Sequence, residues 1–255
     1  KDERQLRRVR LDNLSEQVIY DVPAEWKGYG TWVANSACTK MVGIEMFDAD
    51  YIPLTDWTKF GEQFNKSPRS RLISIDIESG QRSVLLDEHC WMGHPIYRPF
   101  DDNTVAFCHE GPLDLVDVRM WLVNEDGTNK RKFRERTPEV KGSTHEFWAP
   151  DGSKMIYVTY MNDGSRWICT ADPVTLVNED LMAMPPCSHM MSNHAGDKLV
   201  ADGMGKPIDL SDNSAGADAD NNPYIYFFDL KTKEARKVCT HNTSWAVYRD
   251  NRQVT

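Results

Sequence analysis

The repeat that decides the fold is clearest in the stretch His-Glu-Phe-Trp-Ala-Pro-Asp-Gly-Ser-Lys-Met-Ile-Tyr-Val, which runs from His145 to Val158. It begins with histidine, passes through a short segment to an Asp-Gly turn, and resumes as an apolar segment. A tight turn between two such segments is the pattern of a β-hairpin. The stretch therefore predicts strand, turn and strand.

Two further copies of this pattern also begin with histidine. They run from His94 to Phe107 and from His189 to Asp202, so that successive histidines lie 51 and 44 residues apart. An earlier copy, from Thr31 to Val42, has threonine in place of the histidine. Self-similarity at this period is typical of repeat architectures such as the β-propeller.

A second hairpin follows each copy, starting at Leu72, Met120, Arg166 and Ile225. Four strands in each unit are the composition of a propeller blade. A β-sandwich also has many short strands, but it gives no reason for two hairpins to alternate around one fixed polar residue. We predict an all-β chain, a β-propeller with about four to five blades present.

We expect residues 1–255 to form a single propeller domain, truncated at both ends because a closed ring usually has more blades. Residues 47–69 interrupt the repeat and are predicted to be an insertion between strands of the first blade. Residues 209–222 are rich in Asp, Asn, Ser, Ala and Gly, which predicts a loop.

The composition excludes several function classes. The formal net charge of −9 argues against nonspecific nucleic-acid binding, and no apolar run approaches the ~20 residues of a membrane span. The charged first ten residues do not form a secretory signal. The six cysteines contain no Cys-x-x-Cys pair and are expected to be lone thiols inside strands, which favours a reducing, cytoplasmic location.

The three repeated histidines are candidate functional residues. The first strand of each blade lines the axis of a propeller, so residues at one position of successive blades converge there. Converging imidazoles bind a divalent transition metal or share proton transfer. His94, before Pro95, is explained equally well as a strand cap, whereas His145 and His189 lack a packing rationale. The other histidines lie off this position and are expected at turns or on the surface: His89, His109, His194 and His241.

Arg119 precedes an apolar strand and has two interpretations. The structural one is a salt bridge to Asp114 or Asp117. The functional one is bidentate binding of a substrate carboxylate, for which the planar guanidinium is suited.

Several long and unusual strings resemble one known family. They are Cys108–Pro112 (Cys-His-Glu-Gly-Pro), Leu115–Trp121, Thr144–Trp148, Arg166–Pro173 and Met184–His189. Over the whole chain the sequence is similar to the oligogalacturonate lyases of polysaccharide lyase family 22. The resemblance implies a seven-bladed propeller, of which this chain is a fragment, and a divalent metal, Mn²⁺. The implied activity is β-elimination of short, including unsaturated, oligogalacturonides in pectin degradation, with 4-deoxy-5-keto-uronate-type products.

The resemblance also implies roles for individual residues. His145 matches the base of the family, Arg119 the arginine that binds the substrate carboxylate, and His189 and Gln253 two of its metal ligands. Two further histidine ligands, in a His-Pro-His motif, are expected after Thr255. We therefore expect the chain as given to carry half of the metal ligands and to be inactive alone. The expected partner is a small oligogalacturonide, not a nucleic acid or a membrane.

Two other function classes are weighed against the lyase. A non-catalytic binding scaffold of the TolB or WD40 kind would share the Pro150-Asp151-Gly152 turn, with no metal dependence and no special role for axial histidines. A propeller-bearing peptidase would need a separate catalytic domain with a serine elbow, and the sequence contains none.

Overall fold

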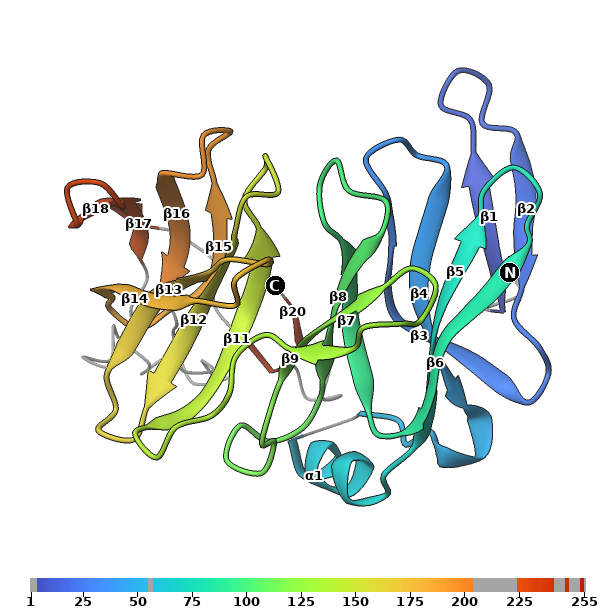
Figure 1. The fold of residues 1–255 in the computed structure, drawn as a ribbon, viewed down its shortest axis with the longest axis horizontal. Coiled ribbons are helices and arrows are strands. Elements are labelled where there is room, and N and C mark those ends of the chain that lie inside the picture. Colours follow the sequence, from blue (N-terminus) through green and yellow to red (C-terminus); the bar gives the residue numbers. More distant parts are fainter. Residues whose placement is uncertain (1–3, 55–56, 204–223, 241–245, 248–252, 255) are drawn as a thin grey trace. The chain divides into compact units, whose positions relative to one another are not determined.

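The structure, a computed structural model, describes residues 4–54, 57–203, 224–240, 246–247 and 253–254. These residues form four antiparallel sheets of four strands, each sheet built from strands that follow one another along the chain (Figure 1). Such sheets are propeller blades, so the predicted all-β propeller architecture is confirmed. The predicted loop at 209–222 and His241 lie outside the described residues.

The chain divides into two compact units, residues 1–136 and 137–255. The first unit holds a two-stranded sheet and two blades. Its elements are β1 (Gln5–Val9), β2 (Glu16–Asp21), β3 (Trp26–Ala34), β4 (Lys40–Phe47), the 3-10 helix η1 (Asp48–Asp50), α1 (Trp57–Asn65), β5 (Arg69–Asp76), β6 (Arg82–His89), β7 (Met92–Tyr97), β8 (Thr104–His109), β9 (Met120–Asn124) and β10 (Arg131–Lys132). The predicted insertion is present: η1 and α1 lie between β4 and β5.

The second unit also holds two blades and a short two-stranded sheet. Its elements are β11 (Val140–Trp148), β12 (Met155–Met161), β13 (Arg166–Ala171), β14 (Asn178–Ala183), β15 (Cys187–Ser192), β16 (Lys198–Gly203), β17 (Tyr224–Asp229), β18 (Glu234–Thr240), β19 (Ala246–Val247) and β20 (Gln253–Val254). The first strands of neighbouring blades lie against each other within each unit, β3 with β7 and β11 with β15.

Apolar side chains from the strands of each unit form its core. In the first unit the buried residues are Val42, Ile44, Leu72, Leu85, Met92, Tyr97, Val105, Phe107 and Val123. In the second they are Ala149, Ile156, Val158, Ile168, Met182, Met184, Cys187, Leu199, Ala201, Tyr226, Phe228 and Leu230. Full burial of one large side chain contributes about 1.5–3 kcal/mol, so packing between adjacent blades is the main source of stability.

A β-bulge interrupts the first strand of every blade. The pairing register shifts between Tyr29 and Val33, Gly93 and Ile96, Thr144 and Phe147, and Cys187 and Met190. A bulge leaves residues of one strand unpaired and redirects their side chains, which is why bulges are common beside functional sites.

The bulges correct the predicted equivalence of the three histidines. His94 and His145 directly follow the last paired residue, whereas His189 comes one place later, after Ser188. In the first blade Gly30, not Thr31, holds the place of His94. The prediction of one shared position is therefore correct for His94 and His145 and wrong for His189.

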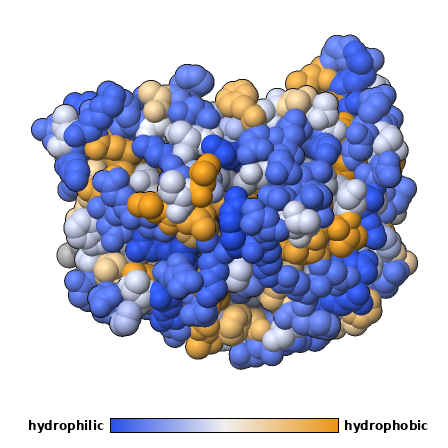
Figure 2. All heavy atoms as spheres, in the orientation of Figure 1, coloured by the Kyte–Doolittle hydropathy of each residue, from blue (hydrophilic) through white to orange (hydrophobic). Residues whose placement is uncertain are grey.

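Apolar residues on the face drawn in Figure 2 occur in small groups between polar ones. Among the described residues, no helix is long and apolar enough to cross a membrane.

Candidate active site

Arg119 lies between β8 and β9, and its backbone carbonyl accepts a hydrogen bond from the amide of His109 at 2.8 Å. Its guanidinium donates to Glu110 in a bidentate pair, Nη1 to Oε2 at 3.0 Å and Nη2 to Oε1 at 3.2 Å. Both side chains are buried, with exposed fractions of 8% and 9%. The salt bridge of the structural interpretation therefore exists, but its partner is Glu110 rather than the exposed Asp114 or Asp117.

Glu110 also meets His94, whose Nε2 lies 3.2 Å from its Oε1. The carboxylate crosses the backbone of β7 at Gly93, where a Cβ atom would lie 2.6 Å from Oε1. Only glycine permits this approach. His94, Glu110 and Arg119 thus form one cluster. Sequence reasoning identified the histidine and the arginine and missed the carboxylate that joins them.

In the second unit, His145 and His189 lie side by side on β11 and β15. Their ring centroids are 5.6 Å apart, and the rings meet edge to face at 81°. His145 has a positive φ of 57°, which the bulge in β11 imposes. The fold therefore brings together two of the predicted site residues that are 44 positions apart in the sequence.

Asp202 on β16 fixes the orientation of His189. Oδ1 accepts the backbone amide of His189 at 2.7 Å, and Oδ2 lies 2.9 Å from Nδ1 of the ring. Because an imidazole N–H donates to a carboxylate, this bond selects the tautomer whose Nε2 carries the lone pair. Metal-binding histidines in proteins are held in this way. The exposed ring of His189 therefore fits a metal ligand that binds through Nε2.

The remaining predicted site residues are less informative. Gln253 lies in β20, where it pairs with Val247, and its side chain lies outside the described part of the structure. His194 is exposed in the turn between β15 and β16. His109 is half-buried at the end of β8, and burial lowers the pKa of its imidazole to about 4, with a further decrease from Lys130.

The family model of the oligogalacturonate lyases matches residues 1–255. The chain belongs to the oligogalacturonate lyase family. An oligogalacturonide lyase of Pectobacterium atrosepticum is 56% identical over 256 residues, which cover 100% of this chain and 66% of that protein. A solved oligogalacturonate lyase in complex with manganese is 52% identical with a TM-score of 0.89, covering 98% of this chain and 63% of the other. The chain thus spans about two thirds of the length of the relatives that it matches.

Similarity to more distant structures shows only the fold of this chain. TolB from Acinetobacter baumannii superposes with a TM-score of 0.57 at 11% identity, covering 95% of this chain and 50% of that protein. This similarity supports the propeller fold and says nothing about activity.

Proposed function

We propose that this protein is an oligogalacturonate lyase that cleaves short, including unsaturated, oligogalacturonides by metal-dependent β-elimination. The observation that carries the proposal is the match of the whole chain to one family of lyases, with more than half of its residues identical to a named lyase. The alternative of a non-catalytic scaffold gives no reason for the carboxylate that orients the exposed ring of His189.

In this proposal His145 is the base. β-Elimination on a uronide removes the proton at C5, breaks the bond between C4 and the bridging oxygen, and forms a C4–C5 double bond. The bridging oxygen takes up a proton, so no water is added. A neutral histidine accepts a proton efficiently near neutral pH, and no nucleophile is required. The bulge in β11 holds His145 in the conformation that turns it out of the strand pairing.

Arg119 neutralises the substrate carboxylate in the proposed mechanism. The proton at C5 becomes acidic only when the adjacent carboxylate is neutralised, and a guanidinium stabilises the charge that develops on it. Glu110 takes two of the five guanidinium N–H groups, so its proposed role is to hold the plane of Arg119 in one orientation. His94, bonded to the same carboxylate, extends this support.

We further propose that His189 and Gln253 contribute to a Mn²⁺ site, with two histidines expected after Thr255. The family relative solved with manganese and the Asp202-oriented imidazole of His189 support this assignment. When bound, the ion would supply Lewis-acid neutralisation of the substrate carboxylate. Asp202 is a positioning residue in this proposal, because it acts only through His189.

The proposed location is the cytoplasm. None of the six cysteines forms a disulfide in the described part of the structure, and disulfides are rare in reducing compartments. The proposed partner is a small oligogalacturonide, not a nucleic acid or a membrane.

Mass spectrometry of the products tests the proposed reaction in the full-length protein with a saturated trigalacturonate. The products of elimination together have the mass of the substrate, whereas products of hydrolysis together carry one additional water. We expect elimination products, and we expect a chelator to abolish their formation. Hydrolysis products, or binding without turnover, would reject the lyase.

The role of His145 has a separate test. We expect His145→Ala to lower kcat by about 10²–10⁴-fold, the range of general base catalysis, while Mn²⁺ binding is retained. The exposed His194→Ala is the matched control and should retain the wild-type rate. An unchanged rate in His145→Ala would remove this residue from the mechanism.

A further inference from the structure

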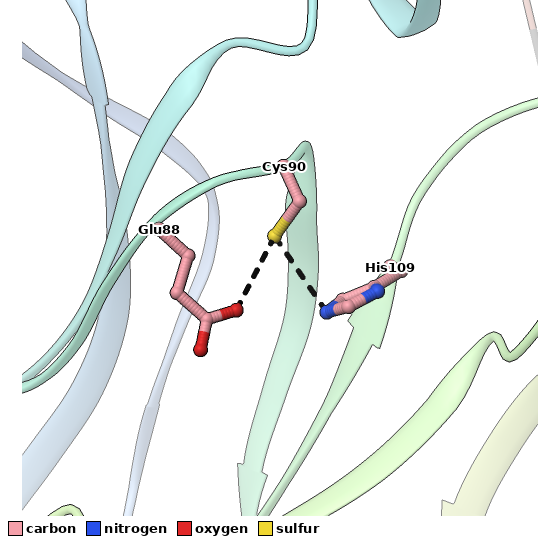
Figure 3. Close-up of side chains that lie close together, drawn as sticks. All are labelled: Glu88, Cys90 and His109. Carbon is pink, nitrogen blue, oxygen red and sulfur yellow. Dashed lines mark hydrogen bonds between the residues drawn. The ribbon is translucent and has the colours of Figure 1, made fainter.

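Glu88, Cys90 and His109 form a cluster in the first unit that the proposed reaction does not use. Glu88 lies on β6, Cys90 between β6 and β7, and His109 at the end of β8. The sulfur of Cys90 lies 3.7 Å from Oε2 of Glu88 and 3.6 Å from Nε2 of His109. Figure 3 shows the carboxylate and the imidazole converging on the sulfur from two neighbouring directions. All three potential ligand atoms lie within 4.8 Å of one another.

These separations match those of a tetrahedral zinc site. With zinc–sulfur bonds of about 2.3 Å and zinc–nitrogen or zinc–oxygen bonds of about 2.1 Å, a tetrahedral angle places the sulfur about 3.6 Å from each other ligand. The two distances from Cys90 already have this value. The ligand atoms of Glu88 and His109 lie within 4.8 Å of each other. We propose that Glu88, Cys90 and His109 bind a zinc-class divalent ion.

The imidazole is held in position before any ion binds. The ring of His109 lies 4.9 Å from that of Trp121, at an interplanar angle of 31°. Cys90 and His109 both line an open pocket of about 410 Å³, which gives an ion a route to the site. A ligand set with an entry path and a fixed histidine meets two requirements of a metal site.

Lys130 competes with the ion. Its Nζ lies 2.7 Å from Oε1 and 2.5 Å from Oε2 of Glu88, and it also lies 4.6 Å from the ring of Trp121. Binding through Glu88 requires this ammonium to move away. The site is therefore weakened by its own salt bridge, and removal of the Lys130 charge should strengthen it.

The thiol determines which metals the site accepts. Thiolate favours zinc, cadmium and cobalt over manganese, which prefers oxygen ligands and imidazole. On binding, the Cys90 S–H bond breaks, the sulfur forms a bond to the ion, and the proton passes to solvent. This site is thus distinct in metal preference from the proposed Mn²⁺ site and does not depend on the proposed lyase activity.

Cobalt titration tests the proposal, because cobalt bound to thiolate has a charge-transfer absorption that cobalt bound to histidine alone lacks. We expect this absorption to saturate at one equivalent, to disappear in Cys90→Ser, and to require at least 10-fold more cobalt in His109→Gln. Lys130→Met should require roughly 5-fold less, the equivalent of one partly exposed salt bridge. Cys38→Ser, which removes an exposed thiol, is the matched control and should leave the titration unchanged.

A thiolate absorption that survives in Cys90→Ser, or none in the wild type at millimolar cobalt, would overturn the proposal. A second measurement needs no variant at the site. Zinc should slow alkylation of Cys90 at least 10-fold, measured on peptides by mass spectrometry, while Cys38 in the same sample reacts at its original rate. Equal effects on the two thiols, or none, would show that the cluster is only a hydrogen-bonded group.

Discussion

Glu110→Gln is the substitution for which the structure predicts the largest consequence. Glu110 is the partner of a buried guanidinium, and both its oxygens accept from Arg119. With an exposed fraction of 9%, the carboxylate is shielded from the solvent screening that weakens surface ion pairs. Glutamine keeps the size of the side chain and removes its charge, so that Arg119 becomes a buried cation without a counter-charge from this residue.

The expected loss of unfolding free energy is about 3 kcal/mol. Removal of one partner of a buried pair costs about 3–5 kcal/mol, and the lower value applies because the glutamine oxygen can still accept one hydrogen bond. For a protein of this size each kcal/mol corresponds to about 2–4 °C, so the midpoint of thermal unfolding should fall by roughly 6–12 °C. Urea denaturation followed by circular dichroism measures the free energy directly.

Two variants make this reasoning refutable. Asp117→Asn removes an exposed carboxylate from the same segment and should change the free energy by less than about 0.5 kcal/mol. The double variant Glu110→Gln with Arg119→Met should be more stable than Glu110→Gln alone, because it removes the isolated charge. If Glu110→Gln is as stable as Asp117→Asn, or if the double variant loses the sum of two independent effects, the pair is not what stabilises this cluster.

Three further variants probe other contacts. Burial, reinforced by Glu45, raises the pKa of Tyr20 to about 12. Since its unfolded pKa is about 10, this tyrosine contributes stability that is full below pH 10 and is lost as the pH rises to 12. Tyr20→Phe should therefore reduce the decline in unfolding free energy over that range by up to about 2 kcal/mol in urea titrations. Gly93→Ala should displace the Glu110 carboxylate and cost about 1–3 kcal/mol by the same assay, whereas Gly61→Ala, with open space around it, should not destabilise. Asp202→Asn should weaken Mn²⁺ binding to the full-length protein by about 10–100-fold, measured by paramagnetic resonance of the free ion, and an unchanged affinity would contradict its positioning role.

The hairpins were predictable from sequence because they form through local interactions. In the turn between β11 and β12, the Asp151 carboxylate accepts hydrogen bonds from the backbone amide of Ser153 at 3.0 Å and from its hydroxyl at 2.7 Å. Residues two positions apart determine such a turn, so it can be recognised without knowledge of the rest of the chain. The blades followed from the recurrence of these hairpins.

The partner of Arg119 was not predictable in the same way. The nearest carboxylates in sequence, Asp114 and Asp117, lie in the connection between β8 and β9 and are exposed. Glu110 is nine residues from Arg119 in the sequence. The pairing of β8 with β9 is extended by the hydrogen bond from the His109 amide to the Arg119 carbonyl, and this bond places Glu110 beside the guanidinium. The signal in the sequence was the position of Glu110 directly after β8 and of Arg119 directly before β9, together with Gly93 on the neighbouring strand β7.

The recurrence of histidine has a cause in the backbone as well as in chemistry. At the first position of the bulge, φ is positive in three blades: 67° at Gly30, 48° at His94 and 57° at His145. Glycine adopts this conformation without cost, and histidine is among the few other residues enriched there. A histidine at this position is therefore compatible with the bulge alone, and its repetition is not by itself evidence of a metal site.

The contacts of each ring carry the functional assignment instead. His94 bonds to a carboxylate that an arginine already holds, which suits structural support of Arg119. His189 is outside the positive-φ position, so the bulge does not explain it, and its Nδ1 bonds to Asp202 as in a metal ligand. His145 shares the backbone position of His94 and the surroundings of His189, whose ring it contacts. In the proposed mechanism the base must lie close to the metal-bound substrate without serving as a ligand, and the contact of His145 with the ring of His189 supports the proposal that His145 is this base.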